Sequence, residues 1–305
     1  MREKILQSLL AFLQKQGFTT ASFISFNSCF DIAARREDLH VLVKVLENID
    51  SFRKENALEL QRLASVLNST ALVVGEKSKA FELKDGIIYD RYGLPVVSLE
   101  TFRQFFKGEI PEVKYFKGME FVELNPERIK ELRIQQGLSV QELAEIIGSS
   151  VESVYRYEQG HNAELEIAKR LEKKLGQGIV ASPMLFEPLR LEASGFKDEG
   201  RIEDNALKQL HSMGLKIAVF KHAPFKAFSK PLEPLMINKA GLSQEIERKA
   251  LVLEKTKTIF DSHSLIIAKE FKLERFQTTP VILEKELEEL HKKKEFLKLL
   301  KEREP

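Results

Sequence analysis

The sequence predicts an α/β plus all-α protein, with one α/β domain on each side of a helical domain. Two observations support this fold class. The run LVVGEK, which begins at Leu72, matches LIIAKE at Leu265, an offset of 193 residues (265 − 72) that neighbouring segments share. Between the two copies, residues 125–177 combine helix caps and glycine stops with apolar residues at helical spacing.

The composition is that of a globular protein, with 43% hydrophobic and 31% charged residues. Its apolar runs are only a few residues long, so we expect no membrane-spanning helix. The single cysteine, Cys29, excludes an intramolecular disulfide and a cysteine-rich zinc site, and it is typical of a cytoplasmic protein. Since 48 basic residues nearly balance 46 acidic residues, any contact with nucleic acid must come from a local surface.

The first α/β copy begins with an amphipathic helix that ends near Gly17. The stretch FDIAARREDLHVLVKV, residues 30–45, predicts two strands joined by a turn. A long helix is expected over 51–68, then the buried strand at Leu72, and a last strand after Pro95 that leads into another helix. The inner face of the long helix would carry Leu58, Leu63, Val66 and Leu67.

The second copy repeats this order of elements. KENALELQRL at 54–63 aligns with ERKALVLEKT at 247–256, and QGFTTASF at 16–23 resembles MGLKIAVF at 213–220. The alternative is a pair of unrelated α/β units with a common layout. The final stretch, KELEELHKKKEFLKLLKEREP, predicts a helix with leucines along one stripe, which is either a solvated last helix or a subunit contact.

The central segment contains the signals of several short helices. Asn125 followed by Pro126 is a good helix start, and Ser139 with Glu142 forms a capping box for the next helix. Gly148 ends that helix, and Asn162 is a candidate cap for a later one. Short helices around a glycine turn indicate a helix-turn-helix. The apolar residues expected to pack are Leu143, Ile146, Ile147 and Val154.

The run LSVQELAEIIGSSVESVYRYEQG, residues 138–160, resembles the lambda repressor/Cro-type helix-turn-helix, and the resemblance extends over about 125–176. It implies that the third helix of this segment enters the DNA major groove. Where that family often has a glutamine after the cap of its second helix, this chain has Val140, which removes one expected polar contact. The residues that the resemblance and local charge assign to DNA are Ser149, Ser150, Val151, Glu152, Tyr155, Arg156, Arg128, Lys130 and Arg133.

The order of elements in each α/β copy resembles the restriction-endonuclease-like fold, which includes archaeal Holliday junction resolvases. The resemblance implies an Asp on the second strand and an acid-x-Lys triplet on the third, with the two acids holding magnesium. Asp31 and Lys44 fit this pattern, but Leu42 stands where the second acid belongs. We therefore expect no catalytic residue, no metal and no cofactor.

The second copy lacks the pattern altogether at the offset of 193 residues. Position 42 maps to Leu235, Lys44 maps to Ile237, and the Asp31 region falls near Lys226. One alternative keeps the first copy active as a structure-selective, metal-dependent nuclease with Asp31, Glu47 and Lys44 as its site. Acids of the following helix, Glu55 and Glu59, are further candidates in that case.

The whole arrangement resembles a group of archaeal helix-turn-helix transcriptional regulators. The resemblance implies a regulator, not an enzyme, that binds double-stranded DNA as a homodimer formed through an α/β domain or the C-terminal helix. The α/β domains would be inactive scaffolds for dimerisation or for binding a partner or effector. The other alternative is a protein that docks on the archaeal transcription machinery without binding DNA. The predicted parts are a nuclease-like domain at 1–117, a helix-turn-helix domain at 118–178, a linker at 179–200 and a second nuclease-like domain at 201–305.

Overall fold

The computed structural model describes two compact units of this chain. The residues described are 1–24, 26, 28–109, 113–116, 118–181, 185–186, 202–230 and 234–305. One unit comprises Met1–Arg2, Leu46–Phe52 and Leu72–Leu185. The other comprises Glu3–Val45, Arg53–Ala71 and Phe186–Pro305. Most of the linker predicted at 179–200 lies outside the described residues.

The first α/β copy starts with a helix and an antiparallel meander. In α1 (Arg2–Lys15), Leu6, Leu9 and Leu13 are buried, which is the spacing of one helix face. The strands β1 (Thr19–Ser22), β2 (Ile32–Arg36) and β3 (Leu39–Asn48) then pair in order. Since Arg36 faces Leu39 across a two-residue turn, the hairpin predicted at 30–45 is confirmed.

The long helix of this copy is α2 (Lys54–Val66). Its inner face carries Ala57, Leu60, Leu63 and Ala64, whereas Leu58 is 52% exposed. The prediction of Leu58 on the inner face is therefore wrong. The buried residues follow one another at spacings of three and four from Ala57, and Leu58, one position after Ala57, points away from that face.

The same sheet continues through strands that follow α2 in the chain. They are β4 (Thr70–Lys77), β5 (Ile87–Arg91), β6 (Leu94–Val97), β7 (Val113–Phe116), β8 (Met119–Val122) and β9 (Ala163–Glu164), with α3 (Leu99–Phe106) between β6 and β7. The strand order is β1-β2-β3-β4-β6-β5-β7-β8-β9. Because β8 pairs with both β7 and β9, the predicted boundary at 117/118 falls inside a hairpin that hydrogen-bonds to the helical domain.

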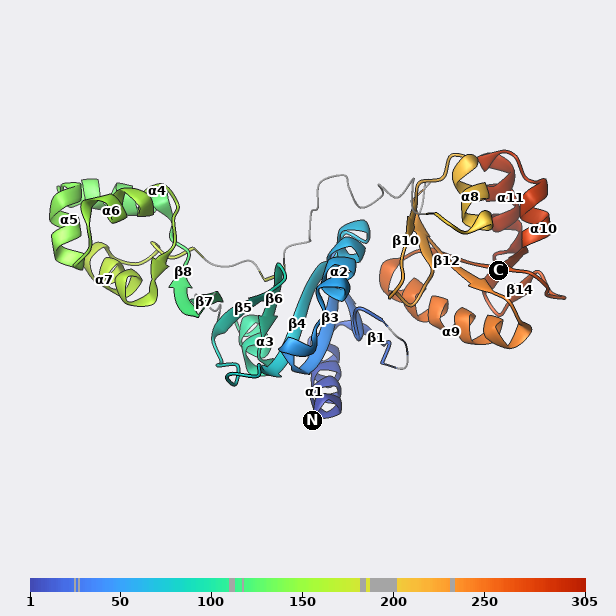
Figure 1. The fold of residues 1–305 in the computed structure, drawn as a ribbon, viewed down its shortest axis with the longest axis horizontal. Helices are drawn as coiled ribbons and strands as arrows, with labels where there is room; N and C mark the ends of the chain where they lie inside the picture. Colours follow the sequence, from blue (N-terminus) through green and yellow to red (C-terminus); the bar gives the residue numbers. More distant parts are fainter. Residues whose placement is uncertain are drawn as a thin grey trace. The chain divides into compact units, whose positions relative to one another are not determined.

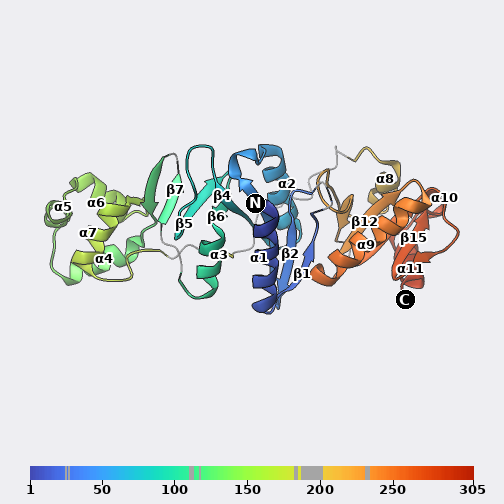
Figure 2. The same ribbon diagram turned by 90° about the horizontal axis from the view of Figure 1, so that it is seen from below.

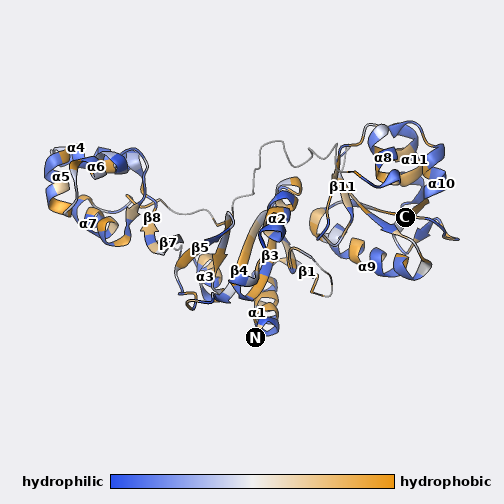
Figure 3. Ribbon diagram, viewed as in Figure 1, coloured by the Kyte–Doolittle hydropathy of each residue, from blue (hydrophilic) through white to orange (hydrophobic). Residues whose placement is uncertain are grey.

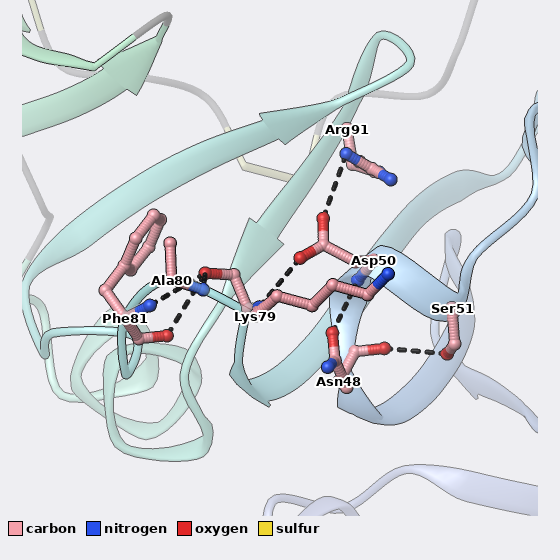
Figure 4. A network of polar contacts seen from close by, with 8 residues as sticks. Asn48, Asp50, Ser51, Lys79, Ala80, Phe81 and Arg91 are labelled. Atoms are coloured by element: carbon pink, nitrogen blue, oxygen red, sulfur yellow. Dashed lines mark hydrogen bonds and ion pairs between the residues drawn. The ribbon is translucent and has the colours of Figure 1, made fainter.

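Asp50 anchors the turn after β4, as Figure 4 shows. Its carboxylate accepts a hydrogen bond from the backbone N–H of Lys79 at 2.7 Å and pairs with the guanidinium of Arg91 at 3.2 Å. The side chain of Asn48 in turn accepts from the backbone N–H of Asp50 at 2.9 Å. These bonds fix the segment after β3 to the turn after β4 and to the end of β5.

The helical domain consists of α4 (Pro126–Gln135), α5 (Val140–Ile147), α6 (Val151–Tyr157) and α7 (Leu165–Leu175). Figures 1 and 2 both show these helices gathered in one bundle. The cap predicted at Asn162 is wrong, since β9 intervenes and Glu164 precedes the first turn of α7.

The second α/β copy is built from ten elements of its described residues. They are α8 (Asn205–Ser212), β10 (Ile217–Val219), β11 (Ala227–Ser229), β12 (Leu235–Ala240), α9 (Ser243–Phe260), β13 (His263–Ala268), β14 (Arg275–Phe276), β15 (Thr279–Leu283), α10 (Glu284–Glu289) and α11 (Lys293–Arg303). The strand order is β10-β11-β12-β13-β15-β14, the same pattern as β1-β2-β3-β4-β6-β5. The predicted repeat is thus confirmed in its topology.

Local details repeat as well. The rings of Phe23 and Phe30 meet edge to face at 5.1 Å in the first copy, and those of Phe220 and Phe225 do so at 5.8 Å in the second. In the first copy the backbone N–H of Phe23 donates to the carbonyl of Asp31, and in the second copy the N–H of Phe220 donates to the carbonyl of Lys226. In each copy the acceptor directly follows the second phenylalanine of the pair. This shared detail favours a duplication over two unrelated units with a common layout.

The sheet of the second copy is covered on both faces. Its core cluster joins α8, α10 and α11 to alternate strand residues, whereas α9 packs on β12 and β13 from the other side (Figure 1). Hydrophobic and hydrophilic residues alternate along the helices, as one-sided packing requires (Figure 3). Within the described ranges, no helix combines the length and apolar character needed to span a bilayer.

The C-terminal stretch forms two helices, not one, and its inner face is internal. Phe296 and Leu300 of α11 are buried in the core of their own domain. Arg303 is 7% exposed, and its guanidinium forms a bidentate pair with Glu286 at 2.9 and 2.6 Å. The interpretation of this stretch as a solvated last helix is therefore wrong for that face, and the face is not free for a subunit contact.

We expect Arg303→Ala to destabilise the second α/β copy by about 2 kcal/mol, because it leaves the Glu286 carboxylate without its buried partner. Hydrogen exchange of peptides from β15 and α10 measures the opening free energy. Lys298→Ala, which removes only an exposed pair with Glu302, is the control and should change it by less than about 0.5 kcal/mol. Equal effects of the two substitutions would contradict the structural role of Arg303.

Candidate nucleic-acid interface and nuclease-like centre

The helix-turn-helix geometry is set by local hydrogen bonds. The Ser139 hydroxyl accepts from the backbone N–H of Glu142 at 3.1 Å, and the Glu142 carboxylate accepts from the N–H of Ser139 at 2.7 Å. This second bond lowers the pKa of Glu142. Gly148 then ends α5 with φ 67° and ψ 45°, a left-handed conformation that lets the chain turn directly into α6. The predicted capping box and glycine turn are confirmed.

The two helices pack through a small apolar core. Leu143, Ile147 and Val154 are fully buried, as predicted. Ile146 is 48% exposed, so its predicted place in this core is wrong, because it lies on the outer face of α5 beside buried Ile147.

An accessible face runs along α6. Val151, Glu152, Tyr155 and Arg156 are exposed, and their spacing places all four side chains on one side of the helix. Ser150 is the N-cap of α6, and its hydroxyl accepts from the N–H of Ser153 at 3.1 Å. The structure therefore brings together the α6 residues that the sequence singled out, with Ser149 half-buried at the turn.

Arg133 has a different place from the one expected. Its guanidinium forms a bidentate pair with Glu158 at 2.6 and 3.0 Å and donates to the carbonyl of Leu138 at 2.9 Å. The side chains of Arg133 and Glu158 are only 11% and 8% exposed. The hydrogen bonds that Arg133 donates to Glu158 raise the pKa of Arg133. The pair joins the end of α4 to the end of α6, so Arg133 holds α6 in place rather than reaching outward.

The other basic residues of α4 are accessible. Lys130 is exposed, and Arg128 pairs with Glu131 at 2.8 Å on the surface. Sequence reasoning missed the role of Arg170, whose guanidinium donates to the carbonyl of Ile147 at 3.1 Å and so caps the end of α5 from α7. No local sequence signal connects two residues that are so far apart in the chain.

The nuclease-like centre retains two of its expected residues in contact. Asp31, which directly precedes β2, lies opposite Lys44 of β3, with Lys44 Nζ 3.2 Å from Asp31 Oδ1. Asp31 Oδ2 accepts from the backbone N–H of Val45 at 2.8 Å, and Lys44 Nζ donates to the carbonyl of Ser28 at 3.0 Å. Asp31 is 2% exposed. Both carboxylate oxygens are thus used inside the protein.

These residues do not fit a magnesium site. Leu42 is fully buried and has no oxygen to offer. Glu47 pairs with Lys77 at 3.5 Å, and its odd separation from Lys44 along β3 places it on the opposite face of the strand. Within the described residues, no group of three acidic, histidine or cysteine side chains could hold a metal ion.

The second copy has the same backbone hydrogen bonds around this position, called the frame below, but different side chains. Lys226 N bonds to Ile237 O as Asp31 N bonds to Val43 O, so Lys226 holds the position of Asp31, in the region where the offset predicted it. The frame also places Asn238 at the position of Lys44, where its side chain donates to the carbonyl of Pro224 at 3.2 Å. The predicted match of Lys44 with Ile237 is wrong by one residue, because the segment from β12 to β13 is one residue shorter than the segment from β3 to β4, and Leu42 corresponds to Met236.

Comparison with known proteins agrees with this division. The PD-(D/E)XK superfamily domain matches residues 2–111, and the helix-turn-helix family matches residues 129–180. Relatives with the provisional name HTH-type transcriptional regulatory protein are similar over nearly their whole length. One from Archaeoglobus fulgidus is 32% identical over 99% of both chains, and one from Methanocaldococcus jannaschii is 32% identical over 98% of this chain and 96% of its own. A third, from Thermoplasma acidophilum, is 30% identical over 99% of this chain and 98% of its own.

The chain belongs to this family of archaeal HTH-type regulatory proteins. No solved structure matches it. In this family member, the helix-turn-helix has an accessible face on α6, whereas the PD-(D/E)XK domain keeps its Asp and Lys as a buried pair beside Leu42.

We expect Arg133→Ala to destabilise the helical domain by about 3 kcal/mol, because it leaves Glu158 buried without a partner. Hydrogen exchange of α4 to α6 measures the loss. Arg156→Ala, which removes an exposed arginine from the same domain, should change stability by less than about 0.5 kcal/mol. If Arg133→Ala left stability unchanged and weakened DNA binding alone, the original prediction of a phosphate contact would be correct.

Proposed function

We propose that this protein is a sequence-specific DNA-binding transcriptional regulator that inserts α6 into the major groove of double-stranded DNA. The observation that carries the proposal is the accessible face of α6 on a helix-turn-helix held by the Ser139 capping box, the Gly148 turn and the Arg133–Glu158 pair. The membership of the chain in a family of HTH-type regulatory proteins supports the same function.

The residues on this face have the chemistry of base readout. Arg156 can donate two hydrogen bonds to a guanine edge, and Glu152 can accept from the amino group of cytosine. Val151 and Tyr155, which are 40% and 53% exposed, offer apolar contact to a thymine methyl group. Arg128 and Lys130 on α4 supply positive charge for phosphates. Ser149 contributes through the turn, where its backbone N–H bonds to the carbonyl of Ala144, and Ser150 contributes as the exposed cap of α6.

The regulator acts as a homodimer, because two-fold symmetry doubles the contact with DNA and matches paired half-sites. The inner face of α11 is used within its own domain, so the dimer contact lies elsewhere on the chain. The protein works in the cytoplasm, where archaeal DNA lies, and its buried single thiol needs no oxidising compartment.

The α/β copies act as scaffolds rather than as enzymes in this proposal. A nuclease of this fold needs two acids to hold its metal. Leu42 replaces one of these acids, and the other, Asp31, has both oxygens engaged by Lys44 and Val45.

We expect Arg156→Ala to weaken binding to a selected duplex about tenfold or more and to relax base preference at one position. Lys130→Ala should weaken binding to all sequences similarly and reduce the salt slope by about one. Duplexes recovered from genomic DNA serve as ligands, and fluorescence anisotropy at several salt concentrations measures affinity. Lys298→Ala on α11 is the charge-matched control. Unchanged affinity in Arg156→Ala combined with Glu152→Ala would favour a docking protein that does not use this surface for DNA.

We expect no cleavage of branched or nicked DNA in the presence of millimolar magnesium or manganese, and no metal-dependent rise in thermal stability. Gel electrophoresis and calorimetry provide the two measurements. Cleavage that disappears in Asp31→Asn would show an active nuclease and overturn this part of the proposal.

A further inference from the structure

The helix α2 of the first copy contacts the second copy through two charged side chains. Glu59 accepts hydrogen bonds from the backbone N–H groups of Lys221 and His222, the latter at 2.7 Å. Arg62 donates to the carbonyl of Val219 at 2.9 Å, and its guanidinium lies over the ring of Phe220 at 5.0 Å. Val219 ends β10, the edge strand of its sheet. Arg62 therefore donates a hydrogen bond to a backbone carbonyl on the open edge of that sheet.

The helix α9 of the second copy contacts the first copy in return. It packs beside β1, the edge strand of the first sheet, and beside β2. Arg248 of α9 lies over the ring of Phe26 at 5.5 Å. At the end of α9, the ring of Phe260 stacks on His40 of the β2–β3 hairpin at 5.8 Å, with 27° between the rings.

These two sets of contacts are reciprocal. The helices α2 and α9 hold the same place in the two repeats, and so do the segments that follow β1 and β10. Each helix touches the segment after the edge strand of the other copy, which is the pattern of an isologous interface between identical subunits. The two segments also meet directly, because the N–H of Cys29 donates to the carbonyl of His222 at 2.6 Å.

The interface lies next to the nuclease-like centre. Ser28, whose carbonyl accepts from Lys44, precedes Cys29 in the segment that touches His222. Burial raises the pKa of the Cys29 thiol, with Glu59 as the next contributor and Lys44 acting in the opposite direction, so the interface acid and the lysine of the centre both lie near this thiol. Glu59 was a candidate to replace the missing metal-binding acid. Its carboxylate instead accepts hydrogen bonds from the backbone of the second copy.

We propose that the second α/β copy acts as a second subunit tethered within the same chain. The two copies form an intrachain equivalent of a homodimer, and their interface lies beside the Asp31–Lys44 centre. The face of the first copy formed by α2 and the segment after β1 is occupied by the second α/β copy within the same chain. The edge strands β1 and β10 are covered in the pair, and Glu59 is engaged by backbone N–H groups. A homodimer of full chains therefore forms through other surfaces. This inference does not depend on DNA binding.

The test separates the copies covalently while they are folded. A protease recognition sequence is inserted between Phe196 and Lys197 of the full chain, the folded protein is cut, and the fragments are analysed by size-exclusion chromatography over a dilution series. We expect the fragments of the otherwise unaltered chain to elute together. Their separation at micromolar concentration would overturn the proposal.

Substitutions in α2 identify the contacts that hold the pair. Glu59→Ala combined with Arg62→Ala should weaken association of the fragments about tenfold or more, since three hydrogen bonds and a cation–π contact are lost. Lys54→Ala combined with Glu55→Ala, a pair of the same charges at exposed positions of α2, is the matched control. Glu59→Gln alone keeps an acceptor and should have a smaller effect. Circular dichroism before cutting verifies that each variant is folded. Equal association in the double variant and the control would overturn the assignment of these contacts.

Discussion

The buried carboxylate of Asp31 is the interaction on which the first α/β copy depends most. One oxygen pairs with Lys44, and the other accepts from the backbone of Val45, so a single side chain ties the residue directly before β2 to β3 at two points. A buried charge is tolerated only with such partners, since desolvation would otherwise cost several kcal/mol. Leu42 stands where the second acid is expected, and the two residues that match the layout of a metal centre form an ion pair with each other.

The helical domain separates structural charges from accessible ones. Arg133 and Glu158 satisfy each other near the core, and Arg170 caps α5 from α7. Arg156 and Glu152 lie on the outer face of α6, where their charges remain hydrated. This separation explains how the domain can present a distinct binding face, because an arginine neutralised by a buried ion pair, as Arg133 is, adds rigidity rather than positive potential.

The two α/β copies show how one frame accepts different chemistry. The backbone bonds around Asp31 recur around Lys226, and the lysine that reaches the carbonyl of Ser28 is replaced by Asn238, which reaches that of Pro224. Both side chains donate a hydrogen bond to a backbone carbonyl in the segment before β2 or before β11. This position therefore requires a hydrogen-bond donor and not a particular charge. The conserved frame lets the copies pair through equivalent surfaces even though the identity of most side chains has changed.

The sequence by itself determined the helix caps, the Gly148 turn, the β2–β3 hairpin, the repeat and the loss of the second acid at Leu42. Each of these depends on residues close together in the chain or on a spacing that recurs along it. Only the tertiary structure decided that Arg133 faces Glu158 rather than solvent, that Ile146 and Leu58 point outward, and that α11 belongs to its own core. It also decided that Asn238 stands at the place of Lys44, and that Glu59 binds the backbone of the second copy. The physical reason is common to all of them: burial and pairing of a side chain depend on which distant surface packs against it, and local spacing carries no record of that partner.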